Sequence, residues 1–281
     1  MRPARVLPAL LLSILVAAPV RVSKADELAQ IATQRGDLPG PESAEPLLAY
    51  IARPKGPGPF PAVVVLHGCS GFGEHEIRVA LTLKTWGYVA LALDSLGGAN
   101  TCGERGGKQA ELVDAYAALA YLSVQSFVAW DRIAVMGYSM GGAATLYAVE
   151  RGAFERDQFL HFRAAVAYYP ACDTSQGGMT VPTLVLTGTR DDWTPASACQ
   201  QMAAGESDIG ITRRTGKDPL VILVTYPGAT HAFDVRRPTR HYHGHLLEYN
   251  DGAAKDAEAR VRNFLQTTLS DARDEGPGSK P

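Results

Sequence analysis

The sequence predicts a single α/β domain in which helices cover both faces of a mostly parallel sheet. Apolar runs of four to seven residues recur along the chain. They are near-continuous rather than alternating, which is typical of strands buried on both faces. Stretches with helical spacing separate these runs, and this alternation favours a parallel sheet. A length of 281 residues is sufficient for one such domain with a large core.

The elements can be placed in chain order. Residues 47–52 could form an early strand, and the Pro/Gly-rich residues 53–59 form a turn. We expect the later strands at residues 62–66, 88–93, 133–136, 164–168, 183–187 and 220–226. We expect helices at residues 76–86, 108–122, 139–150, about 195–205 and 253–266, where apolar side chains recur on one face.

The N-terminus has the pattern of a secretory signal peptide at residues 1–25. A short basic stretch precedes an apolar segment at residues 7–20, which is too short for a comfortable membrane span. Ser23 and Ala25 supply small residues at a cleavage site, so we expect export to the periplasm or outside the cell. Arg21 and Lys24 are unusual there, which leaves an uncleaved anchor as the alternative.

We therefore divide the chain into the signal peptide, an N-terminal arm at 26–46, the α/β domain at 47–270 and a disordered tail at 271–281. The formal net charge is −2, and the charged residues that removal of the signal peptide would take away are all basic, so the mature chain would be more acidic. Since no basic stripe remains, no nucleic-acid partner is expected. The sequence does not indicate an oligomeric state.

The chain has four cysteines, an even number that in an exported protein permits two disulfides. Of the three possible pairings, we expect Cys69–Cys102 and Cys172–Cys199, because each pair lies on loops that follow neighbouring strands. Four reduced, buried cysteines are the alternative.

The sequence gives little support for a metal site. No Cys-x-x-Cys occurs. His241, His243 and His245 would place three imidazoles on one side of an extended segment, which could bind a metal, but no carboxylate or cysteine closely precedes them, and a solvent-exposed loop is favoured instead. We expect no metal and no cofactor.

The segment Gly137-Tyr138-Ser139-Met140-Gly141 lies between a predicted strand and a predicted helix. This is the context of a nucleophile elbow, a sharp turn that presents the serine hydroxyl at the top of the sheet. The flanking glycines leave room for the strand and the helix to meet. Ser139 is therefore the candidate nucleophile.

A serine hydroxyl needs a base within hydrogen-bond reach, and the base needs a third group to orient it. His231 follows the predicted strand at 220–226, and Asp191 and Asp192 follow the strand at 183–187. The order serine, aspartate, histidine is that of an α/β-hydrolase. We choose Asp191 as the acid, with Asp192 left as the competing assignment.

The oxyanion of a tetrahedral intermediate requires two preorganised donors. The backbone N–H of Met140 is one candidate, since it follows the nucleophile at a helix start. The second should come from the loop at residues 67–71, with the N–H of Cys69 as our choice. His67 is expected to shape this loop, which a Cys69–Cys102 bridge would pin.

Residues 45–268 resemble the dienelactone hydrolase family of α/β-hydrolases. The resemblance is carried by the residues at 66–69, at 87–90 leading to Asp94, at 137–141, at 188–195 and at 228–233. It implies an α/β-hydrolase fold and the triad Ser139, Asp191 and His231. The founding enzymes use a cysteine nucleophile, so the chain looks more like the exported members that use serine.

We therefore expect a serine hydrolase that cleaves a small ester or lactone through an acyl-enzyme. The first alternative is a serine peptidase of the same fold, although the chain has no large extra domain to gate access. The second alternative is a catalytically silent binding protein on a hydrolase scaffold. All three triad residues are present in the sequence, which disfavours that alternative.

Overall fold

The computed structural model describes residues 26–31, 47–95, 107–204 and 220–270. Eight strands form one sheet in the order β1-β2-β4-β3-β5-β6-β7-β8. They are β1 (Asp26–Ile31), β2 (Leu47–Ala52), β3 (Phe60–Leu66), β4 (Val89–Asp94), β5 (Val128–Tyr138), β6 (Ala164–Tyr168), β7 (Thr183–Gly188) and β8 (Val221–Tyr226). The pairs formed by β2 with β1 and with β4 are antiparallel, and the strands from β4 to β8 run parallel. The mostly parallel sheet expected from the sequence is thus confirmed.

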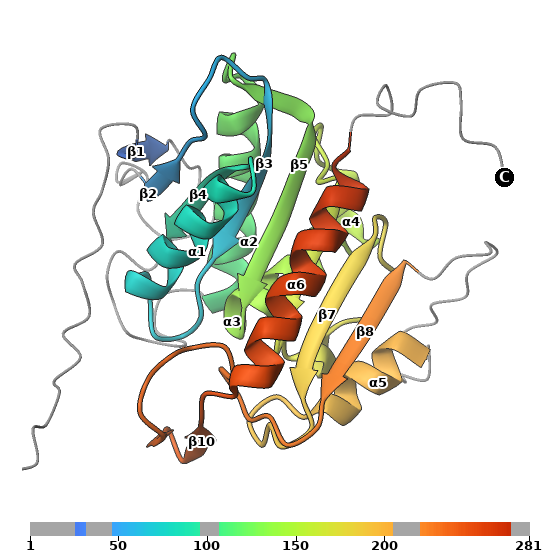
Figure 1. The fold of residues 1–281 in the computed structure, drawn as a ribbon. Coiled ribbons are helices and arrows are strands. Elements are labelled where there is room, and N and C mark those ends of the chain that lie inside the picture. The colour runs from blue at the N-terminus through green and yellow to red at the C-terminus, as the bar shows by residue number, and fades with distance from the viewer. Residues whose placement is uncertain (1–25, 32–46, 96–106, 205–219, 271–281) are drawn as a thin grey trace, which may run out of the picture.

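Helices cover both faces of this sheet (Figure 1). On one face lie α1 (Glu74–Thr85) and α6 (Asp251–Thr268), and on the other lie α2 (Gly107–Ser123), α3 (Met140–Val149) and α5 (Ala196–Ala204). The remaining short elements are α4 (Ala153–Arg156), a 3₁₀ turn (Cys172–Thr174), β9 (Arg240–Tyr242) and β10 (His245–Leu247). Each face has its own apolar core, because successive residues of a strand point to opposite faces. In β3, for instance, Val63 and Val65 pack toward α1 and α6, whereas Val64 packs toward α2 and α3.

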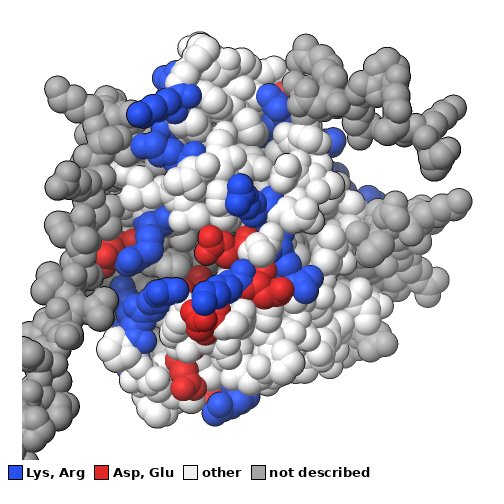
Figure 2. Space-filling model, viewed as in Figure 1, with Lys and Arg blue, Asp and Glu red and all other residues white. Residues whose placement is uncertain are grey.

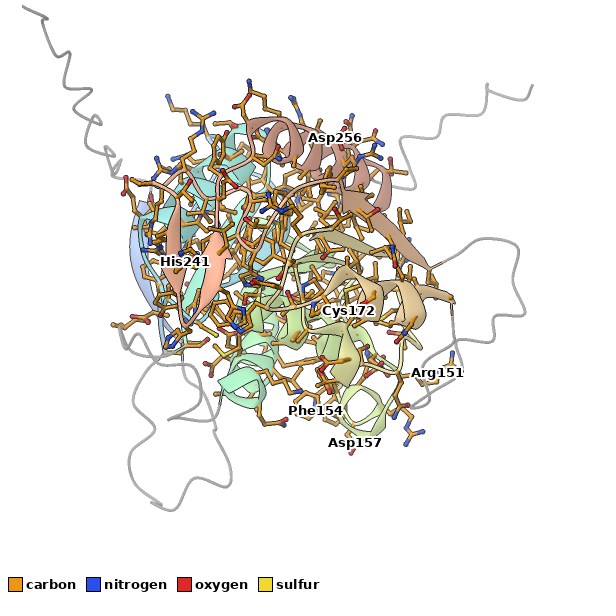
Figure 3. The ribbon with its side chains drawn as sticks, turned by 90° about the horizontal axis from the view of Figure 1, so that it is seen from below. Arg151, Phe154, Asp157, Cys172, His241 and Asp256 are labelled. Atoms are coloured by element: carbon orange, nitrogen blue, oxygen red, sulfur yellow. A yellow bond between two sulfur atoms is a disulfide. The ribbon has the colours of Figure 1, made fainter. Side chains whose placement is uncertain are left out.

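The carboxyl ends of the parallel strands meet at one edge of the sheet. Figure 3 looks onto this edge and shows α6, which carries Asp256, on the opposite side of the sheet from α4, which carries Phe154. The antiparallel pair β9–β10, which carries His241, also lies at this edge. Ligands bind at this edge in open α/β sheets, so the loops here are the ones that can build a site.

Residues 26–31 of the expected N-terminal arm at 26–46 form β1. This strand pairs along its whole length with β2, from Asp26 opposite Ala52 to Ile31 opposite Leu47. The expected signal peptide at 1–25, the rest of the arm and the tail at 271–281 lie outside the described residues. No helix among the described ranges has the length and apolar character needed to span a bilayer.

A disulfide joins Cys172, in the 3₁₀ turn, to Cys199 of α5. It is one of the two expected pairings. Cys69 is also disulfide-bonded, and Cys102 of the other expected pair lies outside the described residues.

Removing the Cys172–Cys199 bridge should lower the stability of the domain. The bridge closes a loop of 27 residues, and the loss of this constraint from the unfolded chain corresponds to about 3–4 kcal/mol. A double Cys172→Ala, Cys199→Ala variant should show this loss in urea unfolding followed by circular dichroism. A free energy of unfolding within about 1 kcal/mol of the wild type would contradict the expectation.

Candidate active site

The turn between β5 and α3 holds Ser139 in a strained backbone conformation. Its φ of 53° and ψ of −112° lie in a region that L-residues rarely adopt. A Cβ on Gly137 would come within 2.1 Å of the Gly141 carbonyl oxygen, and a Cβ on Gly141 would come within 2.5 Å of the His67 carbonyl oxygen. The glycines on either side of Ser139 therefore permit the close contact of strand, helix and neighbouring loop that the sequence predicted.

Three polar side chains from separate strand ends form a hydrogen-bonded chain. His231 Nε2 lies 2.9 Å from Ser139 Oγ, and His231 Nδ1 lies 2.8 Å from Asp191 Oδ2. Both Asp191 and His231 are almost fully buried. Their loops can approach because Gly188 has no side chain: a Cβ there would lie 2.2 Å from the Ala229 carbonyl oxygen. The structure thus brings together the three residues that the sequence selected.

The two competing aspartates lie in different environments. Asp191 Oδ1 accepts hydrogen bonds from the backbone N–H groups of Trp193 and Thr194, at 3.0 and 2.8 Å. Burial alone would raise the pKa of Asp191. The overall shift is downward, because the carboxylate is hydrogen-bonded to His231, is attracted by the positive charge of the His231 ring, and accepts hydrogen bonds from Thr194. Asp192 is exposed and faces His245 instead, with 3.3 Å between Oδ1 and Nδ1. The geometry therefore favours Asp191 as the partner of His231.

Thr194 is a site residue that the sequence did not single out. Its hydroxyl lies 2.9 Å from Asp191 Oδ2, 3.1 Å from His231 Nδ1 and 3.0 Å from the Tyr169 carbonyl oxygen. Its backbone N–H also binds the Asp191 carboxylate. Aspartate side chains commonly accept from N–H groups two and three residues later, so the spacing of Asp191 and Thr194 carried a signal for this role.

The loop after β3 lies directly beside Ser139. A Cβ on Gly68 would lie 3.4 Å from the Ser139 Cβ, and the His67 carbonyl accepts the N–H of Gly141 at 3.1 Å. Met140 begins α3, where the first N–H groups of a helix have no acceptor within the helix. The loop that contains Cys69 and the first residue of α3 thus both adjoin Ser139. The assignment of the Cys69 and Met140 N–H groups as oxyanion donors stays a prediction.

His67 anchors this loop inside the protein, as the sequence suggested. Its Nδ1–H donates to the Gly68 carbonyl at 2.8 Å and lies 3.1 Å from Glu111 Oε1 of α2. Both side chains are fully buried. Burial lowers the pKa of His67 and raises the pKa of Glu111 well above its ordinary value, so both shifts favour the uncharged forms.

Ser139 and His231 line a cavity of about 320 Å³. Trp193 lies over the His231 ring, with 5.0 Å between the ring centroids, and also stacks on His245 at 4.7 Å. Residue Leu247 of β10 forms an isolated bridge with His231, which fixes the β9–β10 pair beside the cavity. Within the described ranges, no three histidine, cysteine, aspartate or glutamate residues are grouped as metal ligands would be.

Comparison with known proteins relates this chain to hydrolases. Residues 47–269 match the family model described as the dienelactone hydrolase family. A Bradyrhizobium sp. protein described as a probable 2-oxo-3-(5-oxofuran-2-ylidene)propanoate lactonase is 27% identical over 209 residues, which cover 68% of this chain and 80% of that protein.

Solved structures share the fold at low sequence identity. Thermogutta terrifontis esterase 2, in a structure phosphorylated by paraoxon, has a TM-score of 0.63 at 17% identity and covers 88% of this chain and 96% of that chain. A dienelactone hydrolase-like promiscuous phosphotriesterase from metagenomic libraries has a TM-score of 0.61 at 19% identity and covers 88% of this chain and 100% of that chain.

Proposed function

Because the chain belongs to the dienelactone hydrolase family, and is therefore a hydrolase, we propose that it cleaves carboxylic esters or lactones with Ser139 as the nucleophile. The observation that carries this proposal is the continuous chain from Asp191 through His231 to the Ser139 hydroxyl, with both hydrogen bonds below 3.0 Å. A nucleophile, a base and an orienting acid in hydrogen-bond contact are the parts that acyl transfer requires.

In the proposed acylation step, Ser139 Oγ attacks the substrate carbonyl carbon while its proton passes to His231 Nε2. The carbonyl oxygen becomes an oxyanion, which the backbone N–H groups of Met140 and Cys69 stabilise. Asp191 accepts the Nδ1–H of His231 and stabilises the imidazolium that forms. Collapse of the intermediate breaks the bond to the alcohol oxygen, and that oxygen takes the proton from His231 Nε2. In a lactone this oxygen remains tethered to the acyl group.

In the proposed deacylation step, a water molecule takes the place of the alcohol. His231 Nε2 accepts a proton from this water as its oxygen attacks the acyl carbon. The second intermediate then releases the carboxylic acid, and Ser139 Oγ regains a proton from His231. The hydrogen bonds to Asp191 and the charge of His231 lower the pKa of Asp191, which favours the ionised carboxylate that stabilises the imidazolium in both steps.

We also propose that the protein acts outside the cytoplasm. Disulfides persist in oxidising compartments, and the Cys172–Cys199 bridge is consistent with such a compartment. The signal-peptide pattern at residues 1–25 is the second support for this proposal.

A substrate panel tests the proposed activity. We expect purified protein to hydrolyse p-nitrophenyl esters or a γ-lactone, with release of p-nitrophenolate followed by absorbance and lactone opening followed by proton release. A p-nitroanilide peptide in the same panel tests the peptidase alternative. Turnover of the peptide with no turnover of any ester or lactone would contradict the proposal, and so would a folded protein inactive on every substrate.

A further inference from the structure

A second cavity, of about 260 Å³, lies between α1 and α6 on the face of the sheet that these helices cover. Buried or half-buried apolar and aromatic side chains make up its inner part: Val79, Leu83, Trp86, Met136, Tyr168 and Val261. The mechanism proposed above uses none of these six residues.

This second cavity adjoins the cavity that contains Ser139. His75, Tyr138, Val235, Arg237 and Tyr249 line both. Since Tyr138 directly precedes the candidate nucleophile, the shared wall begins one residue from the reacting hydroxyl. Together the two cavities reach the size of small-molecule sites, which is roughly 300–1,000 Å³.

We propose that the second cavity binds the apolar arm of the acyl group of an ester substrate, an inference that rests on the proposed function. His231, which would protonate the leaving alcohol, lines only the first cavity, as does Trp193 beside it. The alcohol must therefore lie on the His231 side. The acyl group stays bonded to Ser139 and extends past Tyr138, toward the space between α1 and α6.

The charges at the mouth of the second cavity favour an uncharged arm. Arg78 pairs with Glu74 at 3.1 Å, and Asp251 pairs with Lys255 at 2.6 Å and with Arg236 at 3.7 Å. Figure 2 shows basic and acidic side chains interleaved over this face of the molecule. The charged residues that line this cavity are of both signs, four basic and three acidic: Arg78, Arg236, Arg237, Lys255, Glu74, Asp234 and Glu258. No large excess of one sign therefore gathers at the rim, and the apolar interior is left to select the ligand.

Filling the cavity from either helix tests this assignment. Val79→Trp would fill it from α1, and Ala254→Trp would fill it from α6. Leu81→Trp is the matched control, because Leu81 is also half-buried on α1 but lines neither cavity. The measurement is kcat/KM for p-nitrophenyl octanoate divided by kcat/KM for p-nitrophenyl acetate, in variants whose circular dichroism matches the wild type.

Each buried methylene contributes about fourfold to the specificity constant, so excluding two or more should exceed tenfold. We expect the octanoate-to-acetate ratio to fall at least tenfold in both filled variants and to stay within twofold of the wild type in Leu81→Trp. A ratio within twofold of the wild type in either filled variant would overturn the proposal. An equal fall in the control would overturn it as well.

Binding of octanamide, a neutral analogue with no ester bond, separates this proposal from the proposed function. We expect calorimetry to give tighter binding of octanamide than of acetamide, with at least a tenfold loss of octanamide affinity in the filled variants. This result with no ester turnover by the wild type would overturn the proposed function alone. Ester turnover with no dependence on acyl length or on the filling substitutions would overturn the acyl-arm proposal alone.

Discussion

Replacement of Ser139 by alanine should lower kcat for p-nitrophenyl acetate by about 10⁴-fold or more. The substitution removes the atom that would form the acyl-enzyme, while the loop that supplies the oxyanion donors remains. Any residual activity would then come from direct attack of water on a bound and polarised ester. Initial rates at saturating substrate measure this effect, and a kcat within tenfold of the wild type would exclude Ser139 as the nucleophile.

The thermal stability of the Ser139→Ala variant serves as the control for folding. Ser139 has a φ of 53°, a strained conformation for alanine as for serine, so the substitution should change stability little. Thermal unfolding followed by circular dichroism should give a transition close to that of the wild type. Loss of activity with an unchanged transition would then report on chemistry rather than on folding.

Replacement of Asp191 by asparagine should lower kcat by about 10³–10⁴-fold. The side-chain oxygen of asparagine can still accept the N–H groups of Trp193 and Thr194, but its amide nitrogen would face His231 Nδ1. An N–H donor at this position forces the histidine proton onto Nε2. The imidazole can then no longer accept the proton of Ser139. Steady-state kinetics on p-nitrophenyl acetate measure the loss.

Asp192→Asn is the matched control, since this exposed neighbour contacts His245 and not His231. We expect its kcat to stay within about threefold of the wild type. A large loss in Asp192→Asn with little loss in Asp191→Asn would reverse the assignment of the acid. Comparable losses in both would indicate that the two carboxylates act together on His231.

The sequence predicted the sheet because its inner strands are buried on both faces. Runs such as residues 62–66 are apolar throughout and leave little ambiguity, whereas β1 consists of the mixed residues Asp-Glu-Leu-Ala-Gln-Ile. Nothing local favours a strand at β1, which forms through its pairing with β2. In β5, only residues 133–136 were predicted, because the exposed Trp130 and Asp131 interrupt the apolar run within a strand that spans Val128–Tyr138.

The residues of the candidate site that could be predicted are those whose chemistry requires a particular residue type directly after a strand. Ser139, His231 and Asp191 each follow a recognisable strand, and an elbow or a strand-end loop places them together. Thr194 was missed because its role depends on a hydroxyl that meets two side chains from different loops. The Glu111 contact with His67 was missed for a similar reason, since these residues lie 44 positions apart and meet only when α2 packs against the sheet.

Covalent labelling can show whether His231 activates the Ser139 hydroxyl as a nucleophile. The wild type is incubated with a fluorophosphonate, digested and mapped by mass spectrometry, with Ser139→Ala and His231→Ala treated in parallel. The proposed triad predicts one adduct on the Ser139 hydroxyl, absent from Ser139→Ala and formed far more slowly in His231→Ala, because His231 Nε2 would no longer accept the proton. An unmodified Ser139 in folded wild-type protein, or a rate of labelling that does not depend on His231, would contradict it.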